Sequence, residues 1–436
     1  MRQNAPMGMT RRALLGVVGA TAFAAGCGDA SPGPPVARVS SQPSPQPPTV
    51  RFDAATVTER VTAELTRFLS RTPENPQHPT YAGAVALVTI AGEPVLHVAV
   101  GDALRYGAGP VELPVSQRVP MREDAIFDLA SITKVYTALL LLQQIDRGHV
   151  TLDTPVVSVL PEFAGPGKAA VTVRMLLTHT SGLPVGATLS GSTAAARRAS
   201  VLATPLISGT TPGTVYRYSS VGLMIAAYLV EKVTGQGFDE ALRTGLLEPL
   251  GLRETGFLPP RWLEPSVLRA RVAATDARSS RGLLRGVVHD DVANRLGGIA
   301  GHAGIFSTAK DVAAIGHLLL NGGALGGTRI LAEQTVRDML TNANAGLPAV
   351  DPDRPQRSAD HGLGVVLNQP WLMGNLSTVD TFGHTGFTGT SLVVHPPAQL
   401  VLVLLTNRAH PNWSWANPDP VRVSIANLVA GGLSRS

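Results

Sequence analysis

The β-rich segments of this 436-residue chain lie at its two ends, and the sequence between them is helical. Residues 82–90 and 94–100 are rich in strand-forming residues, and Ala91-Gly92-Glu93 indicates a hairpin between them. The second group of apolar runs covers residues 362–367, 379–383, 391–395 and 400–406. Strands so far apart predict one sheet built from distant sequence, with an inserted helical region. The fold class expected is therefore α+β.

Several segments carry the apolar spacing of helices, and one of them differs from the rest. Residues 131–147 are apolar on nearly all faces and are followed by Gly148, which predicts a buried helix. The other predicted helices have ordinary periodicity and cover residues 57–71, 174–177, 221–233, 238–247 and 418–433. No internal repeat is visible.

The first residues predict export and a lipid anchor. Arg11-Arg12 precedes an apolar stretch over residues 13–26 that is too short to span a bilayer, and the pair resembles a twin-arginine signal. Residues 24–27, Ala-Ala-Gly-Cys, resemble a bacterial lipobox. Cys27 is the only cysteine, so neither an intrachain disulfide nor a cysteine metal site can form. We expect residues 1–26 to be an export signal and Cys27 to be lipidated on the outer face of the cytoplasmic membrane.

The segment after Cys27 has the composition of a disordered tether. Residues 28–50 hold seven prolines with Ser, Gln and Gly and few large apolar residues. We place the tether at residues 27–55 and one folded domain at residues 56–436. The net charge of +5 falls to +2 once Arg2, Arg11 and Arg12 are removed with the signal, and the arginines form no dense cluster. This distribution argues against nucleic-acid binding, and we expect a monomer.

The buried helix begins with a pair of residues suited to nucleophilic chemistry. Ser131 and Lys134 are three residues apart, so a helical turn brings the hydroxyl within reach of the amine. A serine needs an adjacent base to act as a nucleophile, and a lysine can be that base when burial lowers its pKa. Lysine is scarce in this chain, which has only four. The same spacing recurs at Ser307 and Lys310, where Thr308 and Asp311 predict only the start of a helix.

Two further segments carry candidate site residues. Tyr218 precedes the helix predicted over residues 221–233, and a tyrosine beside a lysine and a helix N-terminus can have a lowered pKa and can shuttle a proton. His384-Thr385-Gly386-Phe387 lies between two predicted strands, where glycine permits close approach of a ligand to the strand edge. The imidazole of His384 can donate or accept a proton.

These three segments together resemble the serine β-lactamase and penicillin-binding-protein superfamily, in its class C-like serine hydrolase branch. Ser131-Ile132-Thr133-Lys134 matches the S-x-x-K motif of that family. Tyr218-Ser219-Ser220 is similar to its Y-x-N motif, and His384-Thr385-Gly386 is similar to its K-T-G motif. The resemblance runs from about residue 56 to the C-terminus. It implies a β-lactamase/transpeptidase-like fold with an antiparallel sheet made from N- and C-terminal strands.

The resemblance also implies roles for these residues. Ser131 is the nucleophile that becomes acylated, and Lys134 and Tyr218 transfer protons. The amides of Ser131 and Phe387 form the oxyanion hole, while Ser220, His384, Thr385 and Gly386 contact substrate. No metal or organic cofactor is implied.

Two departures from the motifs bear on the substrate. Ser220 replaces the asparagine and His384 replaces the lysine of members that hydrolyse penicillins, and a neutral imidazole binds a carboxylate less well than an ammonium. Both changes favour an esterase, or a carboxypeptidase- or aminopeptidase-like enzyme acting on D-amino-acid peptides of the cell wall. The alternatives are a true β-lactamase, a non-catalytic lipoprotein that binds cell-wall peptides, and a structural surface lipoprotein.

Other histidines have simpler interpretations. We expect His179 and His302 to be structural residues at the floor or rim of the cleft. His289-Asp290-Asp291 lacks further ligands at helical spacing, so it indicates a loop that orders the cleft rather than a metal site. The chain has no G-x-S-x-G segment, which argues against an α/β-hydrolase.

Overall fold

A computed structural model describes residues 50–279, 281–352 and 354–435. The predicted export signal, Cys27 and the proline-rich segment up to residue 49 lie outside the described residues. The predicted end of the tether at residue 55 is wrong. Strand β1 (Val50–Phe52) pairs with β18 (Leu433–Arg435), and the side chain of Asp53 caps helix α1 (Ala54–Arg67). A strand of three residues is too short to show a period in the sequence.

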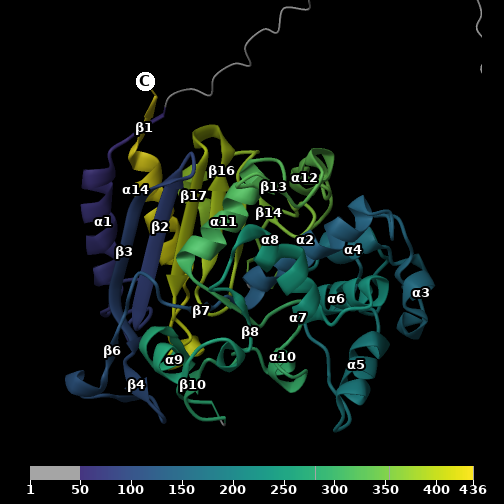
Figure 1. Cartoon of the computed structure of the whole chain (residues 1–436), viewed down its shortest axis with the longest axis horizontal. Coiled ribbons are helices and arrows are strands. Elements are labelled where there is room, and N and C mark those ends of the chain that lie inside the picture. Colours follow the sequence, from purple (N-terminus) through teal and green to yellow (C-terminus); the bar gives the residue numbers. More distant parts are fainter. Residues whose placement is uncertain (1–49, 280, 353, 436) are drawn as a thin grey trace, which may run out of the picture. The chain divides into compact units, whose positions relative to one another are not determined.

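A seven-stranded sheet joins the two ends of the chain, as the sequence predicts (Figure 1). Its strand order is β14-β15-β16-β17-β2-β3-β6, and all neighbours are antiparallel. The central pair is β17 with β2, whose register runs from Leu400 opposite Ile90 to Thr406 opposite Ala84. The strands of this sheet are β2 (Gly83–Ile90), β3 (Glu93–Leu104), β6 (Val119–Pro120), β14 (Val366–Leu367), β15 (Phe382–Thr385), β16 (Ser391–His395) and β17 (Leu400–Thr406).

The sheet is covered by helices on both faces because its central strands are apolar on both. Alternate residues of β2 and β17, among them Ala86 and Leu402, pack with α1 and with α14 (Asp419–Gly431). The intervening residues, such as Leu87 and Val403, belong to the core that includes α11 (Ala309–Leu320). Figure 1 shows α1 and α14 on one side of the sheet and α11 on the other. The second S-x-x-K match is confirmed as a helix start, since Thr308 caps α11 by accepting from the amide of Asp311.

The inserted helical region is built around the predicted buried helix. Helix α2 (Thr133–Asp146) has every residue from Thr133 to Gln144 buried, and it packs against α6 (Ser220–Thr234). The predicted helix over 174–177 is α4 (Val173–Leu177). The predicted helix over 238–247 is α7 (Phe238–Leu242) followed by a π-helical turn at Arg243–Leu247. No helix in the described ranges is long and apolar enough to cross a bilayer.

Two predicted strands have different bounds in the structure. The strand predicted over residues 362–367 shrinks to β14, because Gly364 has a φ of +88° and lies where a Cβ would be 2.4 Å from that of Ala138 in α2. The strand predicted over 379–383 becomes β15, which starts three residues later.

The remaining helices and strands are β4 (Tyr106–Gly107), β5 (Val111–Glu112), β7 (Phe127–Asp128), β8 (Gly256–Phe257), β9 (Ala274–Asp276), β10 (Leu284–Arg285), β11 (Ile305–Ser307), β12 (Ala324–Leu325), β13 (Thr328–Arg329), α3 (Val156–Val159), α5 (Ala194–Ala203), α8 (Glu248–Leu250), α9 (Pro265–Arg271), α10 (Asp291–Arg295), α12 (Glu333–Leu340) and α13 (Pro370–Met373).

Candidate active site

Ser131 lies on a tight turn at the start of α2. The sequence predicts an α-helix from residue 131, but Ala130–Ile132 form a 3₁₀ turn and the α-helix begins at Thr133. Lys134 lies on the first turn of α2, and residues three apart on consecutive helical turns are neighbours. Lys134 Nζ accordingly donates to Ser131 Oγ at 2.9 Å, which brings the predicted nucleophile and base together.

A buried carboxylate holds the backbone on the N-terminal side of Ser131. Ala130 has a φ of +46°, a left-handed conformation that costs free energy for a residue with a Cβ. The Oδ1 atom of Asp128 accepts from the amide of Ala130 at 2.9 Å, and its Oδ2 accepts from the amide of His289 at 2.7 Å. Burial raises the pKa of Asp128, and these two amide hydrogen bonds oppose that rise. Asp128 is thus a positioning residue for the nucleophile turn, and the sequence analysis did not identify it.

Replacing Asp128 with alanine is expected to destabilise the fold by about 3–6 kcal/mol, the sum for two hydrogen bonds to a charged group. The variant leaves two buried amides unpaired, and hydrogen bonds to a charged group contribute about 1.5–3 kcal/mol each. Urea unfolding followed by circular dichroism measures the change. Asp153→Ala is the control, because that carboxylate is 81% exposed and its pair with Arg174 is a surface ion pair. A loss of unfolding free energy below about 1 kcal/mol, the size expected for an ordinary hydrogen bond, would contradict this role for Asp128.

The amine of Lys134 is fully buried, as the predicted buried helix requires. It donates to the carbonyl oxygen of His302 at 3.1 Å in addition to its contact with Ser131. Burial lowers the pKa of Lys134 to about 7, although the negative charge of Asp290 opposes this. A substantial fraction of the protein therefore holds a neutral amine beside Ser131 near neutral pH, and a neutral amine can accept a proton.

Tyr218 lies next to this pair, at the N-terminus of α6. Lys134 Nζ is 4.9 Å from the centre of the Tyr218 ring. The predicted lowering of the tyrosine pKa is wrong: burial raises the pKa of Tyr218 to about 12, and a hydrogen bond with Ser131 only partly offsets this. The phenol is therefore neutral at neutral pH and can pass a proton on, but it is not a phenolate base.

His384 lies on β15 as a neutral, buried imidazole. Burial, followed in size by the charge of Lys134, lowers the pKa of His384 well below its usual value. Its Nδ1 donates to the carbonyl of Thr385 at 2.8 Å, since a carbonyl oxygen can only accept. Its Nε2 is then an acceptor, and it has no partner among the described residues. His384 cannot supply the positive charge that the lysine of the K-T-G motif supplies.

The end of β15 is fixed against the turn that carries Ser131. A Cβ on Gly386 would lie 2.3 Å from the carbonyl oxygen of Leu129, so only glycine fits there. Thr388 donates to the carbonyl of Asp128 at 2.7 Å, and Thr390 donates to that of Leu129 at 3.0 Å. The amide of Phe387 makes no hydrogen bond within the part of the chain that the structure describes. It is available for a developing oxyanion, as the predicted role requires.

The Tyr218-Ser219-Ser220 motif contributes its tyrosine but not its last residue to the cavities at Ser131. Ser219 is the N-cap of α6, accepting from the amide of Gly222 and donating to the carbonyl of Pro184. Ser220 donates its amide to the carbonyl of Val185 at 3.0 Å and lines neither cavity. His179 accepts at Nδ1 from the amide of Ser219, and its ring centre is 4.6 Å from that of Tyr218. This is the structural role expected of His179.

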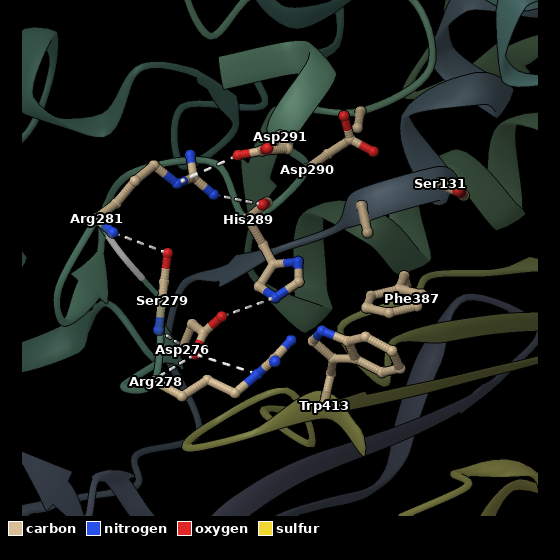
Figure 2. A pocket seen from close by; sticks show the side chains of 12 residues that line it. Ser131, Asp276, Arg278, Ser279, Arg281, His289, Asp290, Asp291, Phe387 and Trp413 are labelled. Carbon is tan, nitrogen blue, oxygen red and sulfur yellow. Dashed lines mark hydrogen bonds and ion pairs between the residues drawn. The ribbon is translucent and has the colours of Figure 1, made fainter. Parts of the chain in front are cut away.

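Two cavities meet at Ser131, and Phe387 lines both. One, of about 460 Å³, is lined by His289, Asp290 and Trp413 among others (Figure 2). The other, of about 430 Å³, is lined by Tyr218 and His384. The ring of Phe387 is 44% exposed and contacts the rings of His289 and Trp413, with centres 5.5 Å apart in each case. We call these the His289 cavity and the Tyr218 cavity.

The His289-Asp290-Asp291 segment orders the cleft, as expected. Asp290 accepts from the amide of Ala293 at the start of α10 and from His302 Nε2 at 3.0 Å. His302 is 2% exposed and acts structurally, because its carbonyl oxygen accepts from Lys134. In Figure 2, Asp290 lies on the wall of the His289 cavity.

Several residues at this site were not predicted from the sequence. His361 is buried with its ring centre 4.9 Å from that of His179. Five arginines line the Tyr218 cavity, namely Arg217, Arg354, Arg357, Arg408 and Arg422. Arg217, which is adjacent to Tyr218 in the sequence, is the one that the motif itself could have indicated.

Comparisons with known proteins find similar sequences and similar folds. A protein of Escherichia coli (strain K12) named "Putative D-alanyl-D-alanine carboxypeptidase" is 29% identical over 363 residues, covering 76% of this chain and 79% of its own. A penicillin-binding protein homologue from Caulobacter crescentus has a TM-score of 0.65 at 22% identity, covering 87% of this chain and 98% of its own. EstCE1, a hydrolase with promiscuous acyltransferase activity, has a TM-score of 0.63 at 22% identity, covering 87% and 99%.

At these identities the two solved structures establish the β-lactamase/transpeptidase-like fold alone. The family model described as Beta-lactamase matches residues 65–427, a span that contains Ser131, Lys134, Tyr218 and His384. The chain therefore belongs to the Beta-lactamase family of serine hydrolases.

Proposed function

We propose that this protein hydrolyses esters or D-amino-acid peptides through an acyl-enzyme formed on Ser131. The observation that carries the proposal is the 2.9 Å contact between Ser131 Oγ and a fully buried Lys134 amine. A surface lysine at the same spacing would stay protonated at neutral pH and could not serve as a base.

Acylation follows from the protonation states at the site. The neutral amine of Lys134 takes the proton of Ser131 as Oγ attacks the substrate carbonyl carbon. The negative charge develops on the carbonyl oxygen, where the amides of Ser131 and Phe387 stabilise it. When the tetrahedral intermediate collapses, the bond to the leaving group breaks. The proton held by Lys134 passes through the hydroxyl of Tyr218 to that group.

Deacylation repeats these steps with water as the nucleophile. Water attacks the Ser131 ester, loses a proton to the Lys134 amine, and releases the acid as Oγ regains its proton. The retained Ser131, Lys134 and Tyr218 support catalysis over the non-catalytic binding alternative.

The nature of the substrate follows from residue 384. A neutral His384 does not supply the cation that the K-T-G lysine supplies in members that hydrolyse penicillins, so we place esters and D-amino-acid peptides above β-lactams. The carboxypeptidase name of the Escherichia coli relative and the hydrolase title of EstCE1 support this order.

The experiment compares three substrates on the protein from Gly28 onward. Turnover of a phenylacetate ester, release of D-alanine from a peptide ending in D-Ala-D-Ala, and intact mass during incubation with benzylpenicillin are followed together. We expect turnover of the ester or the peptide at rates well above any loss of penicillin. Penicillin hydrolysis faster than both would make the protein a β-lactamase. The absence of turnover and of any mass adduct would favour the binding-protein alternative.

A further inference from the structure

The described residues that line the Tyr218 cavity include more arginines than carboxylates. Five arginine side chains line it. Arg354 and Arg422 share the carboxylate of Asp419 at 2.8 Å each, and Arg357 pairs with Asp351 at 3.1 Å. Among the described residues, two carboxylates pair with three of the five guanidinium groups, so arginines outnumber their acidic partners.

Arg217 and Arg408 form no ion pair in the described ranges. The Nε atom of Arg217 is buried without a partner, and its guanidinium has no hydrogen-bond acceptor within the described structure. Arg408 donates to the carbonyl of Trp413, and its Nε is also buried without a partner. Both side chains are otherwise partly exposed to the cavity, and a buried N–H group without an acceptor is unfavourable, so these atoms point to an anion that arrives with a ligand.

Burial has a measurable consequence for one of these groups. It lowers the pKa of Arg408 to about 10, and the nearby charge of Arg422 adds to this. Arg408 nevertheless stays protonated at neutral pH. The cavity therefore keeps its full charge under the conditions in which Lys134 works.

The excess is confined to one side of Ser131. In the His289 cavity, Arg278 lies 4.0 Å from Asp276 and Arg281 lies 3.5 Å from Asp291, and Asp290 adds a further carboxylate (Figure 2). Acids there outnumber arginines. The positive charge is thus a property of the Tyr218 cavity and not of the whole cleft.

The Tyr218 cavity is also the side on which the leaving group departs. Tyr218, the group that delivers a proton to the leaving atom, lines this cavity and does not line the other. His384 shares the same wall but presents an unprotonated Nε2, which cannot bind an anion. The arginines are left as the only cationic side chains among the described residues that line it.

Resting on the function proposed above, we infer that the Tyr218 cavity is a binding site for a leaving group that carries a carboxylate, with Arg217 as its principal ligand and Arg408 as the second. Arg217 is well placed for this role because its amide donates to the carbonyl of His179 at 2.8 Å, which fixes its backbone beside Tyr218. A guanidinium can hold a carboxylate through two parallel hydrogen bonds. An amino acid with a free carboxylate is a leaving group of this class.

Two esters with the same acyl group test this inference. The phenylacetyl esters of 3-hydroxybenzoate and of 3-hydroxybenzamide differ only in carrying a carboxylate or a neutral amide on the leaving group. We expect kcat/KM to favour the carboxylate ester by roughly tenfold to a hundredfold, the range for hydrogen bonds to a charged group. Arg217→Gln should remove most of this preference while the amide ester is still hydrolysed. Arg217→Lys should restore part of it.

Arg337→Gln is the matched control, since it removes the same charge from an exposed side chain that lines neither cavity. It should leave the preference unchanged. An equal kcat/KM for the two esters in the unaltered protein, or a preference that survives Arg217→Gln, would overturn the inference. If the amide ester is hydrolysed in such a case, only the inference about the leaving group is overturned. A protein that hydrolyses neither ester contradicts the proposed function itself. Folding of Arg217→Gln is checked by circular dichroism.

Discussion

Replacing Ser131 with alanine is expected to remove esterase or peptidase turnover by at least about 10⁴-fold. The variant loses the atom that forms the acyl-enzyme, and nucleophile knockouts in serine hydrolases cost up to about 10⁶-fold in kcat. The fold should be unaffected, because Ser131 lies at the junction of the two cavities and its hydroxyl contacts only Lys134 and Tyr218. The measurement is the initial rate on the phenylacetate ester, with intact mass recorded at the same times.

The mass record makes this prediction specific to Ser131. A fluorophosphonate should add one group to the unaltered protein and none to Ser131→Ala. Ser307→Ala is the matched control, because Ser307 has the same spacing to Lys310 but is fully buried and bonds to Thr255. It should label like the unaltered protein. Normal labelling of Ser131→Ala would mean that another residue is the nucleophile.

Replacing Lys134 with arginine should lower kcat by roughly 10²- to 10⁴-fold, the range for a general base. Arginine keeps the positive charge but does not release its proton at any pH the protein tolerates. The neutral amine beside Ser131 is therefore lost. Lys310→Arg is the control, because Lys310 occupies the same position in the second S-x-x-K match and is exposed. This substitution should leave the rate unchanged.

The same residue sets the pH dependence of the unaltered enzyme. Because Lys134 must be neutral to act as a base, and its pKa is lowered to about 7, kcat/KM should be constant above pH 8. It should fall about tenfold for each unit below pH 6, as the amine becomes protonated. An acid limb that lies near pH 4 would instead indicate a carboxylate base. A rate that keeps rising up to pH 10 would mean that Lys134 retains its ordinary pKa.

The parts of the site that could be predicted from the sequence are those carried by one local segment. Ser131 and Lys134 share a single turn, so their spacing alone predicts their contact. The buried helix was equally predictable, because apolar residues on every face exclude a surface position, and this in turn predicts a desolvated lysine. The fold followed from two groups of strands at opposite ends of the chain.

The parts that could not be predicted depend on residues brought together from distant loops. The arginines of the Tyr218 cavity come from segments around residues 217, 354, 408 and 422, and no pattern links them before the chain folds. The role of Asp128 depends on its contact with the amide of His289, which lies 161 residues away. The pKa of Tyr218 was predicted in the wrong direction because the helix position is visible in the sequence, whereas the depth of burial is not.

The joining of β17 to β2 has a consequence for how the enzyme becomes active. Bringing Thr406 next to Ala84 closes a loop of more than three hundred residues, and chain entropy opposes that step before any contact compensates it. The hydrogen bond that the Thr388 hydroxyl donates to the carbonyl of Asp128 forms at the same stage, when the C-terminal strands join the sheet. The turn that carries the nucleophile thus gains its last supports only when the C-terminal strands arrive. A partly synthesised chain holds Ser131 and Lys134 but not the frame that sets their geometry, so we expect hydrolytic activity only after the sheet is complete.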